Sequence, residues 1–407
     1  MKKASVIAKK NRSVDISRLF PYIYYIMRCS GFLPLKSRYT LKDSPLSSSL
    51  IFVSMFFILV DIMCIIESSA EILERLQEPN ISLLLIYEGV RAGFLLQGFT
   101  NHVLMIIMIR KMATILHAVF MFSKNFVITA SSSKYLAVSF GILALAFSFT
   151  GLMSVTKCKM TNQTMPVDEE EDCYLQSSLI IPKLRTDNIV IYFLLLTFRL
   201  FPVLHTFIIS ILVDLWILCI SKAMRDAVRK SKVEFVLLKN KSSFDFEEKF
   251  WVWNEYYENL HSTAQHIARI FSLLLCVSVI CNPALFCVGL YWTILQLREN
   301  DSIAVLLPAF IVILQLTKLT MLATEGTNFQ TQINSLVADT WKLDISGLEK
   351  EVRYQLKAIF IREGIDPVVL TAGNFFTISK HFFLSILGAV FTCVVVFVQM
   401  ASNESEC

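Results

Sequence analysis

The chain has 407 residues, of which 55% are hydrophobic and 17% are charged, and its mean hydropathy is +0.58. Soluble domains carry roughly 25% charged residues, so this composition excludes an ordinary soluble globular protein. The formal net charge is only +5, and its uneven distribution along the chain is typical of membrane topology and gives no indication of a nucleic-acid partner.

Residues 1–46 are basic and polar, and we expect them to form a cytosolic N-terminal segment. No apolar run precedes residue 47, so no cleavable signal peptide is predicted and the first span would serve as the insertion signal. The runs that follow are continuous, which favours helices over the alternating strands of a β-barrel. The fold class is therefore predicted to be all-α, a polytopic membrane protein with seven transmembrane helices. We place the spans at 47–66, 82–108, 135–155, 188–220, 269–297, 303–324 and 380–400.

Two long segments between the spans are amphipathic and predict helices outside the membrane. Residues 221–268 would form a cytosolic helical extension and 325–379 a cytosolic helical anchor segment, together making an assembly bundle. In the anchor segment, Ser346 and Glu349 have the spacing of a capping box, and Gly364 and Pro367 would end the helix. The predicted domains are thus 1–46, 47–220 with helices 1–4, 221–268, 269–324 with helices 5–6, 325–379, 380–400 with helix 7, and an extracellular tail 401–407.

The Lys and Arg residues outside the spans predict the orientation of the chain. The N-terminal segment and the connections after spans 2, 4 and 6 hold 27 of them, whereas the opposite side holds six. By the positive-inside rule, the N-terminus is cytosolic and the C-terminus extracellular. This is the reverse of a G-protein-coupled receptor, which has the same number of spans.

The longest predicted extracellular loop follows span 3. It contains Cys158 and Cys173, a candidate disulfide in an oxidising compartment, although two separate thiols are an equal alternative. Asn162 in the same loop begins an Asn-x-Thr sequon and is the best candidate for glycosylation, because its loop is long.

Motifs of enzymes are missing from the sequence. It contains no HExxH, paired CxxC, Walker or GxSxG motif, so we expect no enzyme, cofactor or metal site. It also lacks the inverted repeats of many transporters.

Ionisable and polar side chains within spans are candidates for function. Glu88 and Arg91 lie three residues apart, so they either pair along one helical face or form a polar wall of a ligand cavity. Asp61 and Arg199 present the same two alternatives, and we interpret Asp214 and Lys318 as side chains that snorkel to the inner membrane surface.

Aromatic residues crowd the outer halves of several spans, either for packing and an interfacial belt or as walls of a small-molecule pocket between helices. The candidate ligand-binding residues are Tyr87, Glu88, Arg91, Phe149, Tyr192, Phe193, Asn282, Phe286, Phe310 and Gln315.

The last span carries small and polar residues on one helical face. Such a face packs against another helix or, when several copies surround a symmetry axis, lines an ion path. Without a fixed charge, the path would select weakly among cations. The candidate pore and gate residues are Ser385, Gly388, Thr392, Val395, Val396, Gln399 and Met400.

The chain ends with the segment TCVVVFVQM at 392–400, which follows LTAGNFFTISKHFFLSILGAVF. The first segment is similar to the TYhhhhhQF signature, in which h is hydrophobic, of the insect gustatory receptor family, and the second resembles that family's entry into its last helix. This family is part of the insect chemoreceptor superfamily of seven-transmembrane ligand-gated channels. Thr392 and Gln399 are kept, whereas Cys393 and Met400 depart from the signature, which indicates a divergent member. Val394 stands where the sugar-receptor branch has Glu, which favours bitter or other plant-derived ligands.

The resemblance implies a tastant-gated, non-selective cation channel with a pocket in the outer half of helices 2–6. It also implies a homotetramer, or a heteromer with related subunits, with a central pore lined by helix 7 and Gln399 and Met400 at the extracellular gate. Its partners would be a small-molecule tastant and membrane lipid, in the plasma membrane of gustatory neuron dendrites. The alternative is a seven-helix receptor of inverted topology that signals through a cytosolic partner without conducting.

Overall fold

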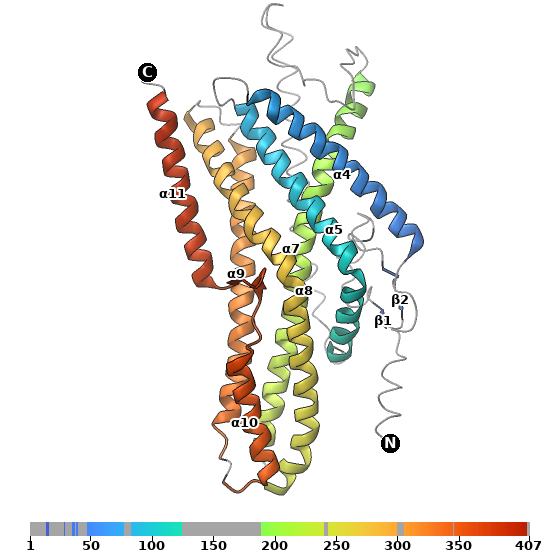
Figure 1. The fold of residues 1–407 in the computed structure, drawn as a ribbon, viewed down its shortest axis with the longest axis vertical. Helices are drawn as coiled ribbons and strands as arrows, with labels where there is room; N and C mark the ends of the chain where they lie inside the picture. The colour runs from blue at the N-terminus through green and yellow to red at the C-terminus, as the bar shows by residue number, and fades with distance from the viewer. Residues whose placement is uncertain are drawn as a thin grey trace, which may run out of the picture.

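A computed structural model of the chain describes long helices that run side by side (Figure 1). The described residues are 14–15, 28, 35–36, 38–39, 47–76, 83–123, 189–239, 243–298, 305–344 and 346–404. Two pairs of short antiparallel strands accompany the helices: β1 (Val14–Asp15) with β2 (Arg38–Tyr39), and β3 (Thr371–Ala372) with β4 (Phe376–Thr377).

Six of the described helices are long and apolar enough to cross a membrane. They are α4 (Ser48–Arg75), α5 (Leu83–Ser123), α7 (Ile189–Lys239), α8 (Ser243–Arg298), α9 (Leu306–Trp341) and α11 (Lys380–Glu404). They overlap six of the seven predicted spans over most of their length, and span 3 at 135–155 lies outside the described residues. The prediction of an all-α membrane protein is confirmed.

Helix α4 is apolar on its outward face. Phe52, Leu59 and Ile66 are 80%, 60% and 56% exposed, and they recur at seven-residue intervals, so they share one side of the helix. Ser54, Asp61 and Ser68 recur in the same way on the opposite, buried side. A helix with this distribution belongs in lipid, because the bilayer solvates the apolar side while polar groups require protein partners.

Helices α7, α8 and α9 are far longer than a bilayer requires. With 51, 56 and 36 residues, they extend about 77, 84 and 54 Å at 1.5 Å per residue, against a hydrocarbon thickness of about 30 Å. Their lower parts form a bundle with α10 (Lys350–Ile365), seen at the bottom of Figure 1. We call this the lower bundle. Its core includes Phe235, Phe250, Trp253, Phe329, Leu336, Val352, Leu356 and Ile359.

Helix α10 confirms the predicted apolar face but not the predicted cap. Val352, Leu356 and Ile359 are buried, and the helix ends at Ile365. However, the helix is preceded directly by Glu349 and has no side-chain cap, so the capping-box prediction for Ser346 is wrong. Instead the Glu349 backbone N–H donates to Glu247 Oε1 of α8 at 2.7 Å. A carboxylate from a neighbouring helix thus satisfies a backbone donor that a local side chain was expected to satisfy.

A tight hairpin formed by β3 and β4 joins α10 to α11. Its turn contains Gly373 and Asn374, which both have positive φ, near 60°, a conformation that Gly and Asn adopt most easily. Ser272 of α8 fixes the turn: its carbonyl accepts the Gly373 N–H at 2.9 Å and its hydroxyl accepts the Asn374 N–H at 3.0 Å. The start of α11 is therefore attached to the middle of α8.

Candidate functional site

The upper parts of α5, α7, α8 and α9 enclose a separate apolar cluster, which we call the upper core. It lies in the half of the bundle where the sequence predicts a ligand pocket. Trp292 of α8 is 8% exposed, and Phe94 of α5 and Phe207 of α7 meet edge to face, with centroids 5.2 Å apart. The full set of buried members is Ile86, Val90, Phe94, Phe207, Ile211, Leu215, Leu285, Trp292, Ile311 and Leu314.

A buried polar network adjoins the upper core. Lys318 Nζ of α9 lies 2.9 Å from Asp214 Oδ2 of α7 and donates to Asn282 Oδ1 of α8 at 3.0 Å. Gln97 of α5 donates to the same Asn282 oxygen at 2.9 Å, and Ser278 donates to Asp214 Oδ1 at 2.6 Å. Four helices are thereby joined through hydrogen bonds to one ion pair.

The network corrects the interpretation of Asp214 and Lys318 as snorkelling side chains. Their residues are 3% and 2% exposed, so both charges remain inside the bundle and neutralise each other. Asn282 is fully buried and is held by protein groups on two sides. The sequence identified Asn282, but Gln97 and Ser278 were not predicted, because an isolated polar residue in an apolar run does not reveal its partner.

Gln315 lies one helical turn from Lys318 on α9. It is fully buried, and neither its amide nitrogen nor its amide oxygen has a hydrogen-bond partner among the described residues. An unsatisfied buried amide costs about 1–3 kcal/mol. A polar group of a bound molecule that formed a hydrogen bond with this amide would remove that cost.

Glu88 and Arg91 pair with each other, as one of the two alternatives predicted. Arg91 Nη1 lies 3.0 Å from Glu88 Oε2 and 3.0 Å from Glu71 Oε2 of α4, and Arg91 Nη2 lies 3.6 Å from Glu67 Oε2. Ser68 also donates to Glu88, at 3.5 Å. The guanidinium thus joins α5 to α4.

The aromatic candidates are divided between two places. Phe310 packs against the upper core. Phe286 instead packs against Val390 and Val394 of α11, and its ring meets Phe391 with centroids 6.5 Å apart. Phe286 therefore couples α8 to the last helix. Phe149 and the side chains of Tyr87, Tyr192 and Phe193 lie outside the described part, as does the side chain of Arg199.

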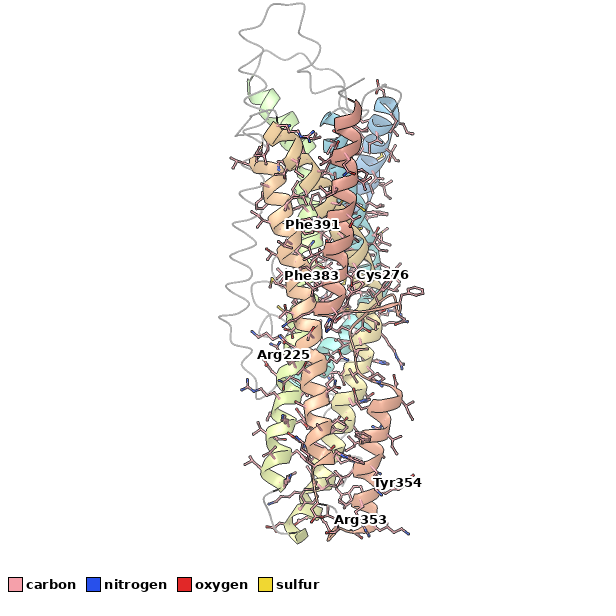
Figure 2. All side chains as sticks on the ribbon, turned by 90° about the vertical axis from the view of Figure 1, so that its left-hand side faces the viewer. Arg225, Cys276, Arg353, Tyr354, Phe383 and Phe391 are labelled. Atoms are coloured by element: carbon pink, nitrogen blue, oxygen red, sulfur yellow. The ribbon has the colours of Figure 1, made fainter. Side chains whose placement is uncertain are left out.

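Helix α11 packs against the rest of the chain along one side only, mainly against α8. Figure 2 shows it crossing in front of the upper helices, with Phe383 and Phe391 labelled. Val390 and Val394 are buried against α8, whereas Val395 and Val396 are 54% and 45% exposed. The candidate pore residues Ser385, Gly388, Thr392 and Gln399 are exposed too, and a Cβ added at Gly388 would meet no atom within 4 Å. The Thr392 hydroxyl donates to the Gly388 carbonyl at 2.9 Å. The side chain of Met400 lies outside the described part.

An open groove of about 720 Å³ lies at the lower end of the molecule, between α8 and α10. Trp251 and Tyr354 line it together with Lys350, Arg353 and Lys357. Tyr354 is 73% exposed and projects from α10 in Figure 2. Ile361 and Ile365 of the same helix are 57% and 79% exposed, so the lower bundle presents apolar and basic side chains together.

Within the described ranges, no group of three or more His, Cys, Asp and Glu side chains is arranged to hold a metal ion. The candidate disulfide of Cys158 and Cys173 and the candidate glycosylation site Asn162 lie outside those ranges.

Comparison with known proteins identifies relatives over nearly the whole chain. Residues 20–404 match the model of the 7tm chemosensory receptor family. The fold is similar to that of the insect olfactory receptor OR5 from Machilis hrabei, with a TM-score of 0.70, 13% identity, and 95% of this chain and 98% of that chain covered. The structure of OR5 in complex with eugenol gives a TM-score of 0.66 and 15% identity, covering 94% of this chain and 97% of that chain. No curated protein matches the sequence.

Proposed function

Because this chain belongs to the 7tm chemosensory receptor family, we propose that it is a gustatory receptor, a tastant-gated and non-selective cation channel. The signature-like segment at 392–400 supports the gustatory branch, and Val394 supports a bitter or other plant-derived ligand over a sugar. The receptor would act in the plasma membrane of gustatory neuron dendrites. The asymmetry of 27 against six Lys and Arg residues supports a cytosolic N-terminus, so that the lower bundle lies in the cytosol.

The proposed ligand site lies in the upper core, beside the buried polar network. Its walls are aromatic and aliphatic, and Gln315 supplies a polar group that lacks a partner, which is the composition of a site for a small organic molecule. The similar receptor OR5 has been solved with eugenol bound, and we extend binding of a small organic molecule to this chain as part of the proposal. Ligand binding would favour the open state by contacts that are stronger in it.

The Gln315→Leu variant tests this site. The variant removes an unsatisfied amide, so the purified receptor should be as stable as wild type or more stable by about 1 kcal/mol. If Gln315 binds the ligand, loss of one hydrogen bond should raise the half-maximal agonist concentration about fivefold. The measurement is calcium influx in cells that express only this chain, first screened with sugars, alkaloids, glycosides and amino acids.

Thr317→Val is a matched control, because Thr317 is exposed on the same helix and donates only to the Ile313 carbonyl, at 2.7 Å. An unchanged agonist concentration in Gln315→Leu, with the normal response of the control, would remove Gln315 from the ligand site.

The proposed pore requires several subunits. One α11 helix cannot enclose an ion path, but four copies around an axis can, with the exposed face of Ser385, Gly388, Thr392 and Gln399 inward. The exposed Tyr354, Ile361 and Ile365 of α10 support assembly through the lower bundle, because large apolar patches on a surface mark interaction sites. We propose a homotetramer, or a heteromer with related subunits.

Substitution of Gln399 tests the channel function itself. In a tetramer, Gln399→Glu would place four carboxylates around the path, so relative calcium permeability should rise several-fold, whereas Gln399→Ala should change conductance without adding charge. Currents are recorded in excised patches without nucleotides or added proteins, and Thr320→Val on the outer face of α9 is the control. Unchanged conductance and selectivity in both variants would refute the pore assignment. A silent patch with confirmed surface expression would favour the non-conducting receptor.

A further inference from the structure

The open groove at the lower end of the molecule combines aromatic and basic side chains, and we call it the basic groove. Its volume of about 720 Å³ lies within the range of small-molecule sites, about 300–1,000 Å³. Trp251 lines it from α8, and residues between Lys350 and Lys357 line it from α10. The proposed ligand site in the upper core and the proposed pore use none of these residues, so the groove calls for an explanation of its own.

Three cations of α10 border the groove on one side of the helix. Lys350, Arg353 and Lys357 are separated by three and four residues, so their side chains are neighbours on the helix surface. Like charges at this spacing weaken a helix. Glu351 is the one acidic residue among those that line the groove, so three positive charges against one negative leave a net charge of +2. A bound anion would relieve this repulsion.

These cations lack the protein partners that other basic residues of the lower bundle have. Arg362 of α10 pairs with Glu258, and Lys232 Nζ of α7 lies 3.2 Å from Asp339 Oδ2. Within the described ranges, the three cations of the groove form no ion pair. Arg353 Nε is moreover shielded from solvent and has no hydrogen-bond partner there. A shielded N–H without an acceptor is costly, and an anionic acceptor would remove that cost.

The aromatic side chains indicate what kind of anion fits. Guanidinium and ammonium groups bind phosphate, and Trp and Tyr rings offer flat faces on which a heterocyclic base can stack. Tyr354 and Trp251 are 73% and 40% exposed, and Tyr354 lies beside Arg353 on α10 in Figure 2. A simple inorganic ion would leave both rings unused, and an apolar ligand would leave the charges unpaired. A molecule with phosphate groups and a flat ring matches both features.

We propose that the basic groove binds a nucleoside polyphosphate from the cytosol, with its phosphates on the three cations of α10 and its base on an aromatic ring. Binding is non-covalent, so no bond forms or breaks. Tyr354 also belongs to the surface proposed for assembly, so the ligand would lie at the edge of that surface. The proposal needs the cytosolic position of the lower bundle but no ion conduction, and its test is therefore independent of the proposed channel function.

The test is equilibrium binding of labelled ATP to the full-length receptor, purified in detergent. Wild type should bind ATP saturably, and unlabelled ATP should compete more strongly than inorganic tripolyphosphate. Arg353→Gln removes a charged donor to phosphate and should raise the dissociation constant of ATP about tenfold. Arg110→Gln is the matched control, because Arg110 is an exposed arginine on α5, and it should bind ATP as wild type does.

A second variant separates contacts with the base from contacts with phosphate. Trp251→Leu combined with Tyr354→Leu removes both rings, so the dissociation constant of ATP should rise about tenfold while that of tripolyphosphate stays unchanged. Equal affinity for ATP and tripolyphosphate in wild type, unaffected by this double variant, would overturn the assignment of a nucleoside.

Other outcomes would overturn the site as a whole. They are the absence of saturable ATP binding to wild type, and an Arg353→Gln variant that binds ATP as tightly as wild type. If Arg353→Gln does not fold, Lys350→Gln and Lys357→Gln replace it, because both lysines are exposed, with the exposed Lys111→Gln on α5 as their control. Each of the two should weaken ATP binding relative to that control, and unchanged binding in both would refute the proposal.

Discussion

Lys318→Met is expected to destabilise the protein by about 3–5 kcal/mol, because it leaves the Asp214 carboxylate buried without its counter-charge. In the native protein the two charges lie 2.9 Å apart and are almost completely shielded from solvent. Ser278 and Asn282 would still donate to Asp214, but two neutral donors do not replace a buried ammonium group. The expected result is a large fall in melting temperature and in the amount of protein at the cell surface.

The double variant Lys318→Met, Asp214→Asn should recover most of the loss. Asparagine keeps an oxygen that can accept from Ser278 and removes the charge, and replacement of both partners of a buried pair is often nearly neutral. Lys111→Met on the exposed side of α5 is the control and should differ little from wild type. If the single variant is as stable as this control, the ion pair does not stabilise the four-helix junction.

Gly326→Ala is expected to separate α9 from the start of α11. A Cβ at Gly326 would lie 2.3 Å from the Ile378 carbonyl oxygen and 3.1 Å from its carbonyl carbon. Both are backbone atoms of the segment that leads into α11, so no side-chain rotation can relieve the clash. Overpacking of this kind costs about 1–3 kcal/mol or more, and here it also displaces the helix that we propose to line the pore.

Gly89→Ala is the matched control, because a Cβ at Gly89 would meet no atom within 4 Å. Alanine is the better helix former by about 0.5–1 kcal/mol, so this variant should be as stable as wild type or more stable. Agonist-evoked current and melting temperature should both fall in Gly326→Ala alone. A Gly326→Ala receptor with wild-type stability and current would show that the close approach at Ile378 is dispensable.

The sequence predicted the helices well because their signals are local and repeated. Long apolar runs located the membrane helices, and the periodic Val352, Leu356 and Ile359 located the buried face of α10. The cap of α10 was predicted wrongly because the Glu349 N–H bonds to Glu247, more than a hundred residues away. Local sequence cannot reveal a partner of that kind.

The candidate site was predicted less completely for the same reason. Asp214 and Lys318 were assigned to the membrane surface one at a time, although together they form an internal pair. Asp214 lies six residues inside the predicted end of its span, about 9 Å along a helix, which is too far for the short side chain of aspartate to snorkel. The distance of Asp214 from the end of its span was therefore the signal in the sequence that indicated a partner inside the bundle. Phe286 was grouped with the ligand aromatics, yet only the packed structure shows that it faces α11.

The length of α9 has a mechanical consequence. A helix of 36 residues spans about 54 Å, and its one proline, Pro308, lies in the first turn, where it interrupts no helical hydrogen bond. Leu314 packs in the upper core and Leu336 in the core of the lower bundle, so the same rod connects the two. A rotation of about 3° about its lower end moves its upper end by about 3 Å. In the assembly that we propose, a small adjustment between subunits at the lower bundle would therefore displace the walls of the ligand site, and substitutions tens of ångströms away would alter the response to ligand.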